Sequence, residues 1–131
     1  MDTRTDISNL DDVKKLVDNF YFKVQRDELL GGIFNGAIKD WPQHLSKMYR
    51  FWQTVLLEEH TYDGSPFPPH AQLPVGKEHF DRWLALFQET IGEHFSGKIS
   101  EEAYWRAGKM AEMFQHKIAY FQARNGSKPL V

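Results

Sequence analysis

The chain of 131 residues has no cysteine, no long apolar run and no excess of basic residues. Without cysteine, disulfides, iron–sulfur clusters and cysteine-based catalysis are excluded. No apolar run approaches the length that spans a membrane, and the polar start has no apolar signal core. The formal net charge of −2 argues against a nucleic-acid partner or a basic membrane-binding tail. We therefore expect a soluble cytoplasmic protein with no membrane and no nucleic-acid partner.

Three familiar site motifs are also missing from the sequence. No His-Glu-x-x-His pair occurs, so a zinc-hydrolase helix is not supported. No Glu-x-x-His pair occurs, although a four-helix di-iron bundle needs two of them. No Gly-x-Gly-x-x-Gly occurs, so no flavin or nicotinamide domain is expected within the chain.

Aromatic residues, in contrast, are abundant. They make up 15% of the chain, with ten Phe, five Tyr and four Trp. Rings are a natural lining for a large flat ligand. The length indicates a single domain over 1–131 with a small core, whose polar ends, about 1–8 and 125–131, are expected to fray.

Apolar residues at spacings of three and four predict an all-α protein with four main helices. The expected helices cover about 8–26, 40–57, 77–96 and 100–124. Small polar residues predict their starts, with Ser8 or Asn9, Asp40 and Ser100 as caps. Pro42 suits a first helical turn, and Asn125-Gly126 is expected to end the fourth helix. The inner face expected for the fourth helix is Ala103, Ala107, Met110, Ala111, Phe114, Ile118 and Phe121.

Two connecting stretches are predicted to lack regular helix. The glycine-rich stretch 31–36 is expected to be irregular. The stretch 58–76 carries four prolines and two glycines, which exclude a long helix but allow a single turn around His70. A long irregular segment inside a small domain is usually functional or disordered.

His70 is the most informative residue, because it lies in this stiffened segment between two aromatic helical stripes. The stripe before it is His44, Met48, Phe51, Trp52 and Val55, and the stripe after it is Phe80, Trp83, Leu84 and Phe87. One metal ligand between two aromatic walls suits a flat apolar cofactor with iron at its centre, which is haem.

Each candidate residue also has a purely structural interpretation. His70 can be a loop histidine without a ligand, and His44 a half-buried histidine bonded to a neighbour. Tyr21 and Trp83 can be core residues whose polar atoms find a partner nearby. Lys47, which follows His44 on the same helical face, can be a solvated lysine.

Seven segments taken in order form a specific pattern: 19–24 (NFYFKV), 32–35 (GIFN), 44–52 (HLSKMYRFW), 55–57 (VLL), 62–66 (YDGSP), 70–74 (HAQLP) and 79–87 (HFDRWLALF). In this pattern the chain resembles the group III truncated haemoglobins of bacteria over nearly its whole length. The doubled-glycine signals typical of the first two groups are absent from their usual places, which fits the third group.

The resemblance implies a two-over-two helical globin sandwich that holds haem b. It implies that His70 is the axial iron ligand and that Tyr21, His44 and Trp83 lie on the distal side. It implies that Lys47 faces a haem propionate. The pocket-wall positions implied are Phe34, Met48, Phe51 and Trp52.

The expected function is binding or transport of O₂, or binding of NO, CO or another small iron ligand. Tyr21 and Trp83 are the expected hydrogen-bond donors, whereas His44 can gate the pocket, donate a hydrogen bond or ligate iron. Nitric-oxide dioxygenation, peroxidase-like turnover and nitrite reduction would each need a separate reductase. A haem-dependent gas sensor acting through a partner and a haem-free interaction module stay open. We expect a monomer or a weak dimer.

Overall fold

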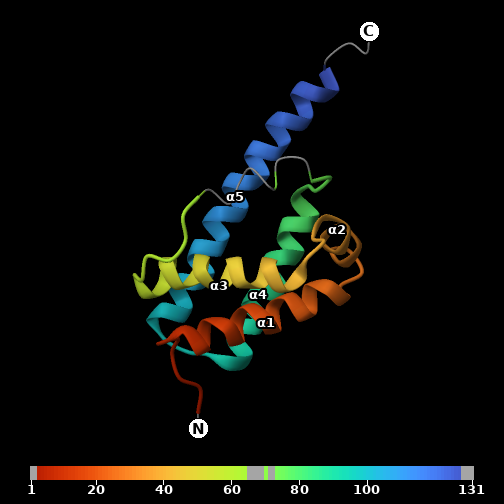
Figure 1. Ribbon diagram of the computed structural model, residues 1–131. Helices are drawn as coiled ribbons and strands as arrows, with labels where there is room; N and C mark the ends of the chain where they lie inside the picture. The colour runs from red at the N-terminus through yellow and green to blue at the C-terminus, as the bar shows by residue number, and fades with distance from the viewer. Residues whose placement is uncertain (1–2, 65–69, 71–72, 128–131) are drawn as a thin grey trace.

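The computed structural model describes residues 3–64, 70 and 73–127 and is built from α-helices (Figure 1). The helices are α1 (Leu10–Arg26), α2 (Gly31–Ala37), α3 (Trp41–Leu57), α4 (Lys77–His94) and α5 (Lys98–Ser127). Within the described residues, extended pairing is limited to one isolated bridge between Thr5 and Phe95. Of the helices described, none is long and apolar enough to cross a membrane. The all-α prediction is confirmed.

Three helices begin where the sequence predicts: α4 begins at Lys77, and α1 and α3 begin at local side-chain caps. The side chain of Asn9 accepts a hydrogen bond from the Asp12 backbone N–H at 2.9 Å, which caps α1. The side chain of Asp40 accepts from the Gln43 N–H at 3.1 Å, which caps α3. Pro42 lies in the first turn of α3, where a missing N–H costs nothing.

The expectation of an irregular stretch at 31–36 is wrong, because α2 forms there. The Asp27 carboxylate accepts from the N–H groups of Leu29 and Leu30, and its carbonyl accepts from Gly31 N–H at 2.8 Å. A Cβ at Gly31 would lie 2.7 Å from the Gln25 carbonyl oxygen, so only glycine allows this close turn. The hydrogen bonds to Asp27 thus start α2, although the glycine-rich sequence of α2 has a weak intrinsic helix propensity.

The predicted start of α5 is also wrong, because the helix begins at Lys98 and Ser100 lies inside its first turn. Ser100 is buried and donates both its N–H and its hydroxyl to Asp6, which also accepts from Ile99 N–H. Asp6 therefore caps α5 from a distant part of the chain. In agreement, Ile7, next to Asp6, is only 2% exposed.

The far end of α5 departs from the sequence prediction as well. The helix continues through Asn125 and Gly126 to Ser127. Its C-terminal part extends beyond the other helices (Figure 1), so few side chains are available to cover it. Phe121, expected on the inner face, is accordingly 39% exposed.

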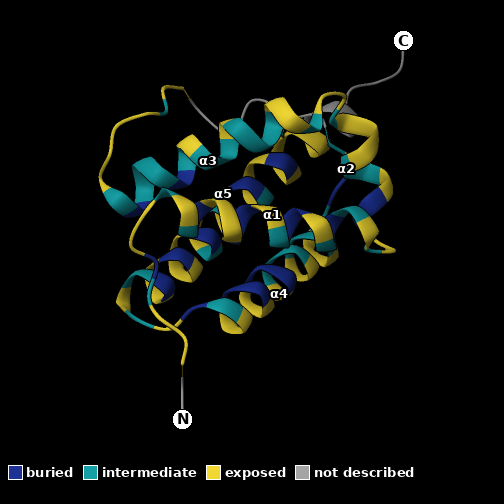
Figure 2. Ribbon diagram, turned by 60° about the horizontal axis from the view of Figure 1, so that its bottom comes forward, coloured by how far each residue is buried: buried dark blue, intermediate teal, exposed yellow. Residues whose placement is uncertain are grey.

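The long helices form two layers, in which α1 and α3 pack together over α4 and α5. Buried residues face the interior between these layers, and exposed residues face outward (Figure 2). The side chains that α1 buries are Val13, Leu16, Val17, Phe20, Tyr21 and Val24. Ala103 and Ala107 are fully buried on α5, and their small size lets the helices approach closely. This is the predicted two-over-two sandwich.

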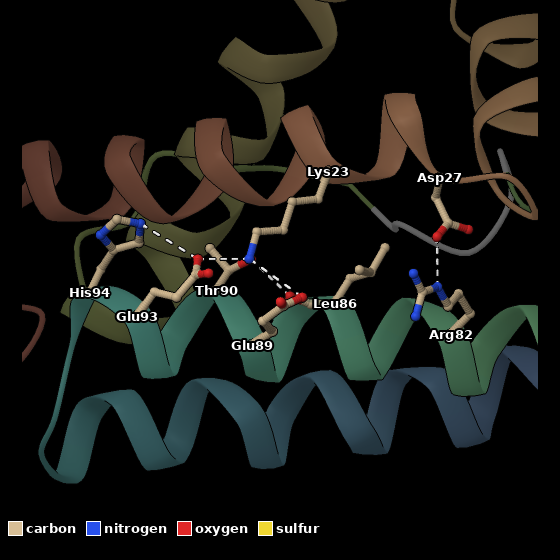
Figure 3. A network of polar contacts seen from close by, with 8 residues as sticks. All are labelled: Lys23, Asp27, Arg82, Leu86, Glu89, Thr90, Glu93 and His94. Atoms are coloured by element: carbon tan, nitrogen blue, oxygen red, sulfur yellow. Dashed lines mark hydrogen bonds and ion pairs between the residues drawn. The ribbon is translucent and has the colours of Figure 1, made fainter.

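Polar contacts join α1 to α4 along one edge (Figure 3). The Lys23 ammonium lies 2.7 Å from Glu93 and 3.5 Å from Glu89. Arg82 donates to Asp27 at 2.6 Å, and the Asp27 side chain is only 4% exposed. Exposed ion pairs contribute little to stability, whereas a nearly buried carboxylate that accepts several hydrogen bonds contributes more. The Asp27–Arg82 pair therefore fixes the α1–α2 corner on α4.

Candidate functional site

A cavity of about 340 Å³ lies among the five helices and the segment between α3 and α4. The nine residues that the sequence singled out all line it: Tyr21, Phe34, His44, Lys47, Met48, Phe51, Trp52, His70 and Trp83. They come from α1, α2, α3, α4 and the connecting segment, so the tertiary fold brings them together. Most of this lining is aromatic or aliphatic, as expected for a site that takes a large apolar ligand.

Further residues line the cavity that sequence reasoning did not name as site residues: Phe20, Leu30, Tyr62, Asp63, Gly64, Leu73, Val75, His79, Met110, Ala111 and Phe114. Met110, Ala111 and Phe114 belong to the inner face predicted for α5, but helical spacing did not predict that they reach this cavity. Phe80 lines the cavity from the expected aromatic stripe, whereas Val55, Leu84 and Phe87 do not. Phe87 lies behind the wall, stacked on Trp52 and Trp83 at centroid distances of 5.2 and 5.7 Å.

The two histidines of interest rest on different walls of the cavity. The His44 ring meets the Tyr21 ring of α1 edge-on, at 5.1 Å and 87°. The His70 ring packs on Phe114 of α5, at 4.8 Å and 34°. The His70 carbonyl accepts a hydrogen bond from Leu73 N–H at 3.1 Å, and the two residues between them lie outside the described part of the chain. The neighbouring Pro66, Pro68 and Pro69 lie outside the described residues.

His44 carries an unsatisfied polar atom. Its Nε2 is buried and has no hydrogen-bond partner among the described residues. Burial, followed by electrostatic repulsion from His70 and Lys47, lowers the pKa of His44 to about 4. The ring is therefore neutral at pH 7. Because buried polar groups are nearly always paired, this atom points to a partner outside the described residues.

Tyr21 and Trp83 are held firmly in the same cavity. Tyr21 is 8% exposed, and burial raises the pKa of its hydroxyl, which therefore stays protonated. Its ring packs against Phe20 at 5.0 Å. The Trp83 ring meets Phe20 edge-on and lies parallel to Phe87 within 2°. Rings packed in this way lose little entropy when their O–H or N–H group binds an acceptor.

Cationic and N–H groups lie on the more exposed part of the lining. Lys47 is exposed, and His79 is half-buried in the first turn of α4. Nδ1 of His79 accepts a hydrogen bond from Gly76 N–H at 2.9 Å, so in this arrangement the ring proton is on Nε2. Lys47 and His79 are therefore two donors suited to carboxylates.

The comparisons with known proteins agree with this architecture. The family model described as bacterial-like globin matches residues 6–120. The chain is 36% identical over 115 residues to the group 3 truncated hemoglobin ctb of Campylobacter jejuni, covering 84% of this chain and 91% of that protein. It is similar to the crystal structure of a group III truncated hemoglobin from the same organism, with a TM-score of 0.80 and 34% identity. That match covers 88% of this chain and 95% of the other.

The fold and the matched length define a bacterial-like globin, and within that family the chain belongs to the group III truncated haemoglobins. Membership of this family implies a haem-binding globin that takes diatomic ligands.

The residues present in the cavity fit a haem group. The lining is largely apolar and aromatic, with one histidine on the α5 side and an unpaired histidine nitrogen on the α1 side. Two donors suited to carboxylates, Lys47 and His79, lie at the same cavity. An apolar ring system with two carboxylates and an iron centre matches each of these features.

Proposed function

We propose that the chain binds haem b in this cavity through neutral His70 and takes O₂ or another diatomic ligand beside Tyr21, His44 and Trp83. The observation that carries the proposal is the buried, unpaired Nε2 of His44 in an apolar cavity that it shares with His70. When bound, haem supplies an iron centre that takes diatomic gases.

The chain's own donors would act on the diatomic ligand. A ligand that draws electron density toward itself is stabilised by O–H and N–H groups that point at it. Tyr21 supplies a hydroxyl whose pKa is raised by burial, and Trp83 supplies an indole N–H. Neutral His44 can donate or accept there according to its tautomer. Aromatic walls keep water from competing for these hydrogen bonds.

Lys47 and His79 would hold the carboxylates of the haem. Both side chains line the cavity, from α3 and from the start of α4 respectively. The Gly76 N–H fixes the orientation of the His79 ring, which lowers the entropy lost when it binds an acceptor.

The first test is the absorption spectrum of the haem-reconstituted protein, ferric and then dithionite-reduced, with and without CO. We expect a Soret band and a five-coordinate ferrous form that takes up CO. His70→Ala should lose or scramble haem binding, whereas His116→Ala, on the exposed face of α5, should leave the spectrum unchanged.

Other spectra would change the conclusion. A normal five-coordinate ferrous spectrum in His70→Ala would refute His70 as the axial ligand. A six-coordinate ferrous form in the wild-type protein would indicate that His44 ligates iron. Without any Soret band, the haem proposal fails and a haem-free interaction module is favoured.

Tyr21, His44 and Trp83 place three polar side chains in one apolar cavity. Because a ligand held by several donors leaves slowly, they also favour redox chemistry over the delivery of O₂. The reaction we propose is NO + O₂ + e⁻ → NO₃⁻, with the electron supplied by a separate reductase. Nitrate formed per NO consumed, under continuous reduction, measures it. Tight O₂ binding without nitrate would leave O₂ binding, or sensing through a partner, as the function.

A further inference from the structure

The position of the His44 ring depends on ring packing rather than on hydrogen bonding. Its Nε2 has no partner in the described part of the chain. Two rings meet it edge-on instead: Tyr21 at 5.1 Å and 87°, and Trp41 at 5.7 Å and 89°. Tyr21 and Trp41 also touch each other, at 5.8 Å and 62°. The three rings form a triangle in which each one restrains the other two.

Trp41 differs from the other two members of this triangle. Tyr21 and His44 line the cavity, whereas Trp41 is absent from the lining and contacts both of them from outside it. Trp41 is the first residue of α3, between the capping Asp40 and Pro42. Proline fixes its own backbone angle, and the cap fixes the start of the helix, so the backbone that carries Trp41 is stiff.

We propose that Trp41 is a positioning residue that holds the His44 ring in the cavity and thereby sets how fast small molecules pass His44 to reach the interior. Edge-on aromatic pairs contribute beyond simple burial. Without the Trp41 ring, His44 loses one of its two edge-on contacts and swings outward more often. The restraint is a property of the chain alone, whereas its effect on gas binding rests on the proposed function.

The restraint is tested first in the haem-free protein, by the rate at which diethyl pyrocarbonate modifies His44. Exposed His116 is the internal reference, and mass spectrometry separates the two sites. In Trp41→Met, which keeps apolar bulk but removes the ring, modification of His44 relative to His116 should rise about two- to tenfold. Trp41→Phe, which keeps a ring, should stay within about twofold of wild type.

Circular dichroism establishes that both variants are folded before labelling. If Trp41→Met fails to fold, Trp41→Leu, which also removes the ring, replaces it, and His44 modification should again rise about two- to tenfold. Unchanged His44 modification in a folded variant without the ring, Trp41→Met or Trp41→Leu, would overturn the proposal.

The consequence for gas entry is measured in the haem-loaded protein, by CO association after flash photolysis. Trp41→Met should speed CO association about two- to tenfold, but should have no further effect in a His44→Ala background. Equal acceleration in both backgrounds would show that Trp41 does not act through His44. Absence of a Soret band would overturn the proposed haem function, and the labelling experiment would still decide the role of Trp41.

Discussion

Asp6 and Ser100 are hydrogen-bonded across 94 residues of sequence, with Ser100 Oγ donating to the Asp6 carboxylate at 2.6 Å. The same carboxylate accepts from the N–H groups of Ile99 and Ser100, both at 2.9 Å. It also lies against Gly97, whose φ of +145° and lack of Cβ allow the close approach. The segment before α1 thus supplies the N-terminal cap of α5.

Removing this cap should destabilise the protein. For Asp6→Ala we expect a loss of about 1–3 kcal/mol in the free energy of unfolding, because one carboxylate satisfies several donors. Urea unfolding at pH 7, followed by circular dichroism, measures it. Asp11→Ala, in the exposed first turn of α1, is the matched control and should cost less than about 1 kcal/mol. Equal losses in the two variants would contradict the capping role.

The same carboxylate should make stability depend on acid pH. Burial alone would raise the pKa of Asp6, but hydrogen bonds from Ser100, Ile99 and Ile7 outweigh it and leave the pKa below its ordinary 3.8. The stabilisation is therefore fully present above pH 3.8 and is lost as the pH falls through the lower folded-state pKa. If the carboxylate plays no part, Asp6→Asn and the wild-type protein should show the same pH dependence of the free energy of unfolding. We expect its stability difference from wild type to be constant near pH 7 and to shrink below about pH 4.

Removing Asp27 should lower the free energy of unfolding more than removing Arg82. Asp27→Ala removes the acceptor for Arg82 and for the N–H groups of Leu29 and Leu30, so we expect a loss of about 1.5–3 kcal/mol. Arg82 is 49% exposed, so Arg82→Ala should cost only about 0.2–1 kcal/mol. Thermal and urea unfolding of the two single variants would show this difference. A larger loss in Arg82→Ala would mean that the ion pair, rather than the start of α2, dominates.

Tyr21 should control how long O₂ stays bound. Because a hydrogen bond to a charged acceptor is worth about 1.5–3 kcal/mol, Tyr21→Phe should speed O₂ release about ten- to a hundredfold. Stopped-flow displacement of O₂ by CO measures the rate. Tyr49→Phe serves as a control, since Tyr49 bonds to Asp18 and does not line the cavity. An unchanged O₂ off-rate in Tyr21→Phe would remove Tyr21 from the proposed donors.

His79 can be tested with a pair of variants that keep its role at the start of α4. Gln and Glu at this third helical position can both accept from the Gly76 N–H. His79→Glu places a negative charge near the haem carboxylates, so it should lose haem about ten times faster than His79→Gln. Haem transfer to an excess of a scavenging apoprotein gives the rates. With haem dimethyl ester the difference should disappear; if it persists, His79 acts on the fold and not on the carboxylates.

Local sequence was sufficient where the stabilising partner lies within one helical turn. Asn9 and Asp40 cap their own helices, so the starts of α1 and α3 could be predicted. The start of α5 could not, because its cap is Asp6, far away in sequence. The helix α2 was missed for another reason. Its partner Asp27 lies only three residues before Leu30, but the glycine-rich sequence does not reveal the close approach of Gly31 to Gln25.

For the candidate site, too, some features could be predicted from the sequence and others depend on tertiary packing. The pattern from Tyr21 to Trp83 identified nine residues that line one cavity, because side-chain type and order carry that information. Helical spacing predicted that Phe114 faces inward, yet only the packing of α5 brings it against His70. Tyr62 and His79 begin two segments of the family pattern, but neither belongs to an apolar stripe, so neither was predicted as a site residue.

By itself, the sequence determined the helical class, the two helix starts that have local caps, and a set of side chains that line one cavity. Periodicity and residue chemistry are properties of short segments, so they can be read without knowing the fold. Only the tertiary structure decided that Asp6 caps α5, that α2 forms, and that Trp41 stands behind His44 and Tyr21. The contacts of Asp6 with Ser100 and of Trp41 with Tyr21 join segments far apart in the chain, so they exist only once the helices have packed.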